Sequence, residues 1–256
     1  MRAKRAALGL GSMASQRLLI VVPASNEEGR IGAVIRGIAE ALPSADVLVV
    51  DDGSSDGTRH ESLSAGARVL SLPVNLGYGS ALQAGYKWAV RGGYDLVGQL
   101  DGDGQHPPEH LPRLLELLED AQVDVAIGSR FLDRDGHYRP SAARKAGIAV
   151  FSRIASLVMR QHITDPTSGY QVMRLPVARF FCTDVYPSDY PDADILILLH
   201  RSGFKVREAG VRMLPSSAKS MHAGHRSLYY VYKMALSILV TLLRKPTMHG
   251  KPTAQP

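Results

Sequence analysis

The chain has 256 residues, 45% of them hydrophobic and 21% charged, and it contains a single cysteine, Cys182. This composition is that of a folded globular protein, and it excludes a low-complexity chain as well as an internal disulfide framework. The length allows one large α/β domain or two small ones. A lone thiol fits a reducing compartment, so we expect the protein in the cytoplasm.

The net charge of +6 is unevenly distributed along the chain. Residues 1–126 hold 11 Lys/Arg and 16 Asp/Glu, a net charge of −5, whereas residues 127–256 hold 19 and 8, a net charge of +11. A basic C-terminal half indicates an anionic partner, which can be a phosphate, a membrane surface or nucleic acid; a merely solvated surface is the alternative.

Strand and helix patterns alternate through the first half of the chain. Short apolar runs predict strands at residues 18–22, 47–50, 67–72, 96–100 and 123–127. Helical spacing predicts helices at residues 31–42, 58–64, 80–90 and 108–118. This alternation predicts an α/β fold with a mostly parallel central sheet flanked by helices, and a site at the carboxyl ends of its strands.

The second half is less regular but shows no linker or repeat. We expect helices at 144–160 and 192–201, strands at 170–174 and 205–214, and a polar loop at 216–224. One catalytic domain over residues 17–226 is therefore predicted, with disordered tails at 1–16, which is basic, and at 246–256.

Residues 227–245 are expected to form a C-terminal helix. Their apolar stretch is shorter than the roughly 20 residues that a bilayer span needs. Two readings remain open: an interfacial helix with tyrosines at headgroup level, or a helix packed on the core of the domain.

The loop after the first strand offers polar groups suited to a nucleoside. Pro23, Ala24, Asn26 and Glu27 can shape a base and ribose pocket, or Asn26 can cap the following helix. Asp52, one strand over, can accept a hydrogen bond from a base edge or a ribose. Glycines around Gly77 precede a helix, where they let backbone N–H groups approach a phosphate or simply form a turn.

The acidic motif at residues 101–105 is the strongest single signal. Asp101 and Asp103, separated by one glycine, suit a hard divalent cation that also carries a diphosphate. We expect Asp103 and Gln105 to hold Mg²⁺ or Mn²⁺, and Asp101 to assist the metal or hold the ribose. An EF-hand starting at Asp101 is excluded, because its sixth and twelfth positions are His106 and Pro112.

Later basic and acidic residues are candidates for handling the acceptor. Arg130 and Arg144 can bind an acceptor phosphate, although surface ion pairs explain them equally well. Asp192 or Asp194 can act as a general base, or can favour the start of a helix by its charge. We select Asp103, Arg130, Arg144 and Asp194 as the catalytic candidates.

Six motifs in order resemble the family-2 glycosyltransferases, which have the GT-A fold, and in particular the dolichyl- and polyprenyl-phosphate sugar (mannosyl) synthases. The motifs are residues 23–27 (PASNE), 51–58 (DDGSSDGT), 75–79 (NLGYG), 101–106 (DGDGQH), 128–130 (GSR) and 168–171 (SGYQ). The resemblance runs from residue 18 to residue 214. The chain departs from the family pattern at Ala24, where an aromatic residue is common, and at Gly102, where alanine is common.

The resemblance implies inverting transfer of mannose or glucose from a nucleoside-diphosphate sugar, GDP- or UDP-linked, to a polyprenyl phosphate, aided by Mg²⁺ or Mn²⁺. It implies nucleotide-sugar contacts from Pro23, Ala24, Asn26, Glu27, Asp52, Gly77 and Asp101, metal contacts from Asp101, Asp103 and Gln105, and lipid-phosphate contacts from Arg130 and Arg144. It also implies peripheral contact with the inner face of the cell membrane.

Two other functions remain open from the residues alone. A glycosyltransferase with a hydroxyl acceptor would need the general base that an ionised phosphate does not. A sugar-phosphate nucleotidyltransferase would carry a Gly-rich, basic loop after the first strand, where residues 23–28 have none. Acidic pairs at strand ends repel polyanions, so no nucleic-acid partner is expected.

Overall fold

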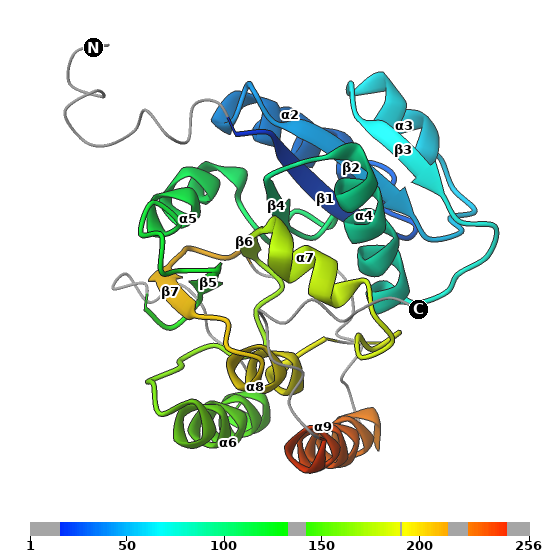
Figure 1. The fold of residues 1–256 in the computed structure, drawn as a ribbon. Helices are drawn as coiled ribbons and strands as arrows, with labels where there is room; N and C mark the ends of the chain where they lie inside the picture. Colours follow the sequence, from blue (N-terminus) through cyan, green and yellow to red (C-terminus); the bar gives the residue numbers. More distant parts are fainter. Residues whose placement is uncertain (1–15, 133–141, 190, 215–224, 245–256) are drawn as a thin grey trace, which may run out of the picture.

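The computed structural model describes residues 16–132, 142–189, 191–214 and 225–244. Within them, a seven-stranded sheet of order β3-β2-β1-β4-β6-β5-β7 forms the centre of the molecule (Figure 1). The strands are β1 (Leu18–Ala24), β2 (Asp46–Asp51), β3 (Arg68–Ser71), β4 (Leu96–Gln99), β5 (Val125–Ser129), β6 (Gln171–Arg174) and β7 (Val206–Gly210). Only β6 runs antiparallel to its neighbours, β4 and β5. The predicted mostly parallel sheet is confirmed.

Helices cover both faces of this sheet. They are α2 (Ile31–Ala41), α3 (Thr58–Ser64), α4 (Tyr78–Gly92), the short 3₁₀ helix η1 (Pro108–His110), α5 (Leu111–Leu117), α6 (Ala142–Met159), α7 (Leu175–Phe181), α8 (Ala193–Arg201) and α9 (His225–Leu243). Successive residues of β1 point to opposite faces: Leu19 and Val21 join the core under α4, α7 and α8, whereas Ile20 and Val22 join the core under α2 and α5. The continuous apolar run of β1 is therefore buried on both sides.

Most expected elements are present, with differences at their ends. The segment 108–118 divides into η1 and α5, and the last strand ends at Gly210 instead of residue 214. Helix α7 was not predicted, because its seven residues follow β6 without an intervening loop. The expected tails and the loop 216–224 lie outside the described residues.

Helices α6, α8 and α9 lie side by side, below the sheet in Figure 1. Met234 and Ile238 of α9 are buried in the core cluster that contains α8, so the helix packs on the domain. Its other side exposes Tyr232, Leu239 and Leu243, with 65%, 52% and 77% of their surface accessible. The expectation of a helix packed on the core is thus confirmed, whereas contact of its exposed face with a membrane stays a prediction.

Candidate active site

Carboxylates gather where β1 and β4 end. Glu27 follows β1, and Asp101 and Asp103 follow β4. Burial raises the pKa of Glu27 to about 7; the Arg30 guanidinium, 2.6 Å from the carboxylate, opposes this rise, and the charges of Asp103 and Asp101 add to it. The structure therefore brings these three predicted site residues within electrostatic reach of one another, as expected for strands that end at one edge of the sheet.

Asp101 is held from two directions. The Tyr78 hydroxyl donates a hydrogen bond of 2.7 Å to Oδ1 of its carboxylate, and its own backbone N–H donates to Nδ1 of His106 at 3.1 Å. The His106 ring is buried and stacks on Tyr170, with 5.1 Å between the ring centroids. Oδ2 of Asp101 lies 3.6 Å from the same ring nitrogen.

Asp103 is held by the turn that contains it. The backbone N–H of Gln105 donates to Oδ1 at 2.9 Å, and the side-chain amide nitrogen of Gln105 contacts Oδ2. Gln105 therefore supports the Asp103 carboxylate; its predicted role as a metal ligand stays a prediction.

The donor set fits Mg²⁺ or Mn²⁺ bound together with a diphosphate. Among the described residues, no group of three His, Cys, Asp or Glu side chains is placed to hold a metal without help. Mg²⁺ is usually bound by one or two carboxylates together with substrate phosphates and water. Asp101 and Asp103 supply two carboxylates, and their charges repel that of Glu27. A cation at this point would offset this repulsion.

Asp52 shapes the loop in front of α4. Its buried carboxylate accepts hydrogen bonds from the N–H groups of Leu76 at 2.7 Å and Gly77 at 3.0 Å, and its own N–H donates to the carbonyl of Ala24. A nucleoside that contacts Asp52, as predicted, would have to share its carboxylate with these two N–H groups. The predicted phosphate contact of Gly77 would require its N–H to change partner.

Two N–H groups in the first turn of α4 are also occupied. Gly79 donates to the Asp189 carbonyl at 2.7 Å, and Ser80 donates to the Ser188 carbonyl at 3.1 Å. A Cβ atom at Gly79 would lie 2.2 Å from the Pro187 carbonyl oxygen. The absence of a side chain at Gly79 thus permits close approach of the 187–189 segment. This approach was not predicted from the sequence.

Asn26 links two loops of the site. It has a left-handed backbone (φ 58°), its N–H donates to Ser54 Oγ, and its Oδ1 accepts the N–H of Ser55 at 3.0 Å. The alternative in which Asn26 caps the next helix is wrong, because α2 is preceded by Arg30 and has no side-chain cap. Asn26 instead fixes the loop after β1 against the loop after β2, beside Pro23 and Ala24.

Arg130 is paired inside the protein. Its Nε and one terminal nitrogen each lie 2.6 Å from the carboxylate of Asp165, which is fully buried, and that terminal nitrogen also donates to Thr167 at 2.7 Å. In this bidentate contact the Asp165 carboxylate offsets the charge of the guanidinium, and the contact joins the end of β5 to the 164–168 turn. An acceptor phosphate would therefore compete with Asp165 for the Arg130 guanidinium. Arg144 lies in α6, but its side chain is outside the described part.

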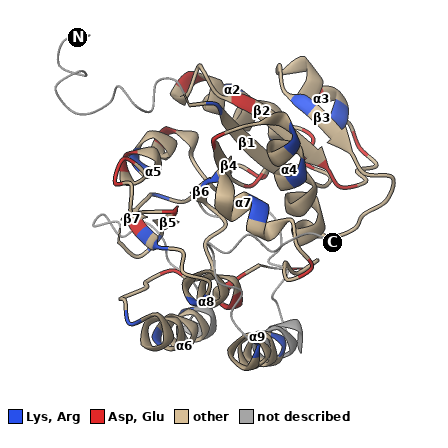
Figure 2. Ribbon diagram, viewed as in Figure 1, with Lys and Arg blue, Asp and Glu red and all other residues tan. Residues whose placement is uncertain are grey.

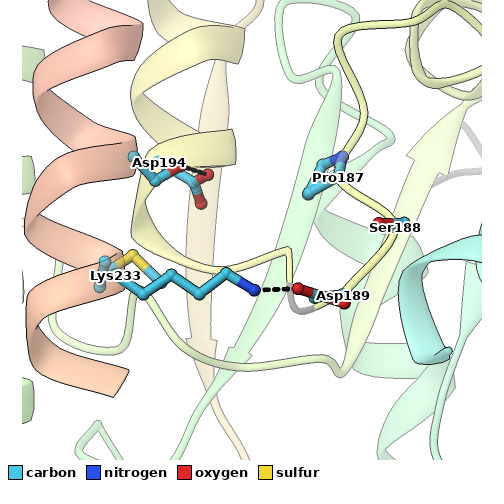
Figure 3. A pocket seen from close by; sticks show the side chains of 7 residues that line it. Pro187, Ser188, Asp189, Asp194 and Lys233 are labelled. Carbon is cyan, nitrogen blue, oxygen red and sulfur yellow. Dashed lines mark hydrogen bonds and ion pairs between the residues drawn. The ribbon is translucent and has the colours of Figure 1, made fainter. Parts of the chain in front are cut away.

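Asp194 faces α9. Its Oδ1 accepts the N–H of Asp192 at 3.2 Å, and its Oδ2 accepts the Ser237 hydroxyl. A cavity of about 250 Å³ opens beside it, bounded by the 187–189 segment and by Lys233, which forms an ion pair with Asp189 (Figure 3). Burial raises the pKa of Tyr78, and the charge of Asp101 and, to a smaller extent, that of Asp192 add to the rise.

Three parts of the candidate site were not predicted from the sequence. Tyr78 and His106 lie inside recognised motifs, yet nothing in their spacing shows that both contact Asp101. The 187–189 segment joins the site through its carbonyl groups, which carry no sequence signal.

Residues 19–180 match the family described as glycosyl transferase family 2. An undecaprenyl-phosphate mannosyltransferase of Micrococcus luteus is 34% identical over 177 residues, which cover 67% of this chain and 72% of that protein. A polyprenol monophosphomannose synthase of Mycolicibacterium smegmatis is 35% identical over 173 residues, which cover 64% of this chain and 63% of that protein. A dolichyl-phosphate hexose transferase of Haloferax volcanii is 33% identical over 157 residues, 61% and 66% of the two chains.

Solved structures show the same fold. Glucosyl-3-phosphoglycerate synthase from Mycobacterium tuberculosis, in complex with Mn²⁺, uridine diphosphate and phosphoglyceric acid, superposes with a TM-score of 0.65 at 19% identity. The match covers 96% of this chain and 84% of that one. The GT-A fold expected from the six motifs is thereby confirmed. The chain belongs to glycosyltransferase family 2 and is a glycosyltransferase.

Proposed function

We propose that this enzyme transfers a hexose, mannose or glucose, from a GDP- or UDP-linked sugar to a polyprenyl phosphate with inversion at the anomeric carbon. The observation that carries the proposal is the acidic pair Asp101 and Asp103 at the edge of the sheet, in a chain related to three enzymes named for polyprenyl- or dolichyl-phosphate substrates. Among the described residues, no third His, Cys, Asp or Glu side chain joins these two carboxylates in a metal-binding group, which suits a cation that is completed by a diphosphate.

The residues of the chain divide the work between donor and acceptor. Asp103, supported by Gln105, and Asp101, supported by Tyr78, would hold Mg²⁺ or Mn²⁺. Such a cation offsets the charge that develops on the departing diphosphate. The loops that carry Asn26 and Asp52 would enclose the nucleoside.

The acceptor needs little activation. A phosphate monoester has a second pKa of about 6 and is largely ionised at neutral pH, so its oxygen can attack without a general base. This agrees with the hydrogen bond from Ser237 of α9, which occupies one oxygen of Asp194. Arg144, which stands in the basic half of the chain, remains our candidate for the acceptor phosphate.

Access to a lipid would come from a surface formed by α6 and α9. Leu157 and Val150 of α6 are 79% and 51% exposed, and α9 presents Tyr232, Leu239 and Leu243. In the described part of the chain, no helix is long and apolar enough to cross a membrane. We propose peripheral contact of these two helices with the inner face of the cell membrane.

A transfer assay tests the proposed reaction. Radiolabelled GDP-mannose or UDP-glucose is incubated with polyprenyl phosphate in detergent with Mg²⁺ or Mn²⁺, and lipid-linked label is extracted. We expect labelled lipid with polyprenyl phosphate, none with unphosphorylated polyprenol, and none with Asp103→Ala. Asp184→Asn, at an exposed acidic residue, is the matched control and should remain active. Transfer to hydroxyl acceptors alone would refute the proposal.

A further inference from the structure

Tyr78 is placed to control the Asp101 carboxylate. It is the first residue of α4, and its hydroxyl donates to Oδ1 of Asp101 at 2.7 Å. Neither carboxylate oxygen of Asp101 has another hydrogen-bond donor among the described residues. Because His106 Nδ1 accepts the Asp101 N–H, it offers Oδ2 a lone pair and no proton. Within the described part of the chain, the Tyr78 hydroxyl is therefore the donor that distinguishes the two oxygens.

We infer that Tyr78 is a positioning residue: by donating to Oδ1 it fixes the orientation of the Asp101 carboxylate that would hold the cation. The inference rests on the proposed function, since it concerns the same site. A hydrogen bond to one oxygen of a metal-binding carboxylate fixes its orientation, and loss of such a partner commonly lowers metal affinity by 10- to 100-fold.

The hydroxyl itself has little freedom. Asp52 and the carbonyls of Ser188 and Asp189 fix the start of α4 through four backbone N–H groups. On the opposite side, a Cβ atom at Gly169 would lie 2.8 Å from the Tyr78 oxygen and 3.7 Å from Oδ1 of Asp101. The Gly169 carbonyl is held in turn by the Gln99 side chain at 2.9 Å. A rigid backbone therefore surrounds the Tyr78–Asp101 contact, and only glycine leaves room for it at position 169.

Two substitutions disturb this contact from opposite sides. Tyr78→Phe removes the hydroxyl and keeps the ring. Gly169→Ala keeps the hydroxyl and displaces it. Tyr94→Phe is the matched control, because the Tyr94 hydroxyl also donates to an aspartate, Asp46, at 2.7 Å, but does so where β2 begins, at the other edge of the sheet.

The experiment is calorimetric titration of each protein with GDP and with UDP, in Mn²⁺ and again in EDTA, alongside melting temperatures. For the nucleotide that the wild type binds, we expect Tyr78→Phe to weaken binding in Mn²⁺ by about tenfold and to leave binding in EDTA unchanged. Gly169→Ala should do the same, and the double variant should lose little more, because both changes act on one contact. Tyr94→Phe should keep the wild-type Mn²⁺ effect.

The outcomes separate this inference from the proposed function. If the wild type gains affinity in Mn²⁺ and Tyr78→Phe gains as much, Tyr78 does not position Asp101, and the proposed function stands. Equal weakening by Tyr78→Phe in Mn²⁺ and EDTA would assign Tyr78 to general packing and overturn the inference. If Mn²⁺ has no effect on the wild type, the proposed cation site is wrong and the inference falls with it.

Discussion

Single ionisable residues carry most of the site's chemistry, and their partners decide what each can do. Asp101 and Asp103 accept hydrogen bonds from neutral donors, the Tyr78 hydroxyl and the Gln105 N–H. Arg130, in contrast, has its charge matched by Asp165. Glu27 lies between these cases, because burial and neighbouring carboxylates favour its neutral form.

Glu27 should make stability depend on pH. Its pKa is raised from 4.5 to about 7 in the folded protein, so the folded chain binds more protons than the unfolded chain between these values. Its contribution is present below pH 4.5 and is lost as the pH rises through about 7. Melting temperatures of metal-free protein should therefore fall over this range relative to Glu27→Gln, which stays neutral.

The neighbouring exposed carboxylate provides the control. Glu28→Gln should keep the wild-type pH profile. A wild-type profile parallel to that of Glu27→Gln across this range would contradict the assignment.

The Arg130–Asp165 pair should matter mainly for stability. Asp165→Asn leaves a buried guanidinium without its counter-charge, and we expect a loss of about 3 kcal/mol or more in the free energy of unfolding measured with urea. Arg207→Gln removes an exposed pair with Asp120 and should cost about 0.5 kcal/mol or less. If Asp165→Asn were as mild as Arg207→Gln, Arg130 would be available for an acceptor phosphate after all.

At the scale of elements, the start of α4 links the site to the second half of the chain. The 187–189 segment accepts its N–H groups, and Lys233 of α9 contacts Asp189 (Figure 3). A glycine at position 79 is required by this packing.

Two glycine-to-alanine changes in helices should have opposite signs. Gly79→Ala places a methyl group against the 187–189 carbonyls and should destabilise the protein by about 1–3 kcal/mol. Gly147→Ala in α6 meets nothing within 4 Å and should stabilise by about 0.5–1 kcal/mol through helix propensity. Urea denaturation measures both. If Gly79→Ala left the free energy of unfolding unchanged, the 187–189 segment would have to move aside at little cost.

The strands of the first half could be predicted because most are short apolar runs, and β2 and β4 are followed by carboxylates and glycines. Asp101 and Asp103 were found for the same reason, since they break such a run. Partners that act through backbone carbonyls, such as Ser188, have no side-chain signature. The ion pair between Arg130 and Asp165 could not be predicted from the sequence either, because the two residues are 35 positions apart. They come together because β6, which follows Asp165, pairs antiparallel with β5, which precedes Arg130.

At the scale of the whole molecule, charge and apolar surface are distributed unequally. The basic residues lie mainly in the second half of the chain. Figure 2 shows Lys and Arg on α6, α7 and α9, and also on α3 and α4. Acidic residues follow β1, β2 and β4. The exposed apolar residues of α9 recur at helical spacing, so they form one stripe on the side away from α8.

This stripe should bind lipid. Leu239→Glu combined with Leu243→Glu should reduce cosedimentation with vesicles that contain phosphatidylglycerol, without lowering the melting temperature, because both side chains are exposed. Leu63→Glu, at an exposed leucine of α3, is the control and should bind vesicles normally. Equal binding by all three proteins would place the lipid contact elsewhere.

The central claim is that a cation joins Asp101 and Asp103 to the diphosphate of the donor. A crystal structure with Mn²⁺ and the preferred nucleoside-diphosphate sugar tests it most directly. We predict Mn²⁺ at about 2.0–2.2 Å from an oxygen of at least one of the two aspartates and from oxygens of both phosphates. A bound donor whose phosphates lie away from both carboxylates, with no metal between them, would contradict the account.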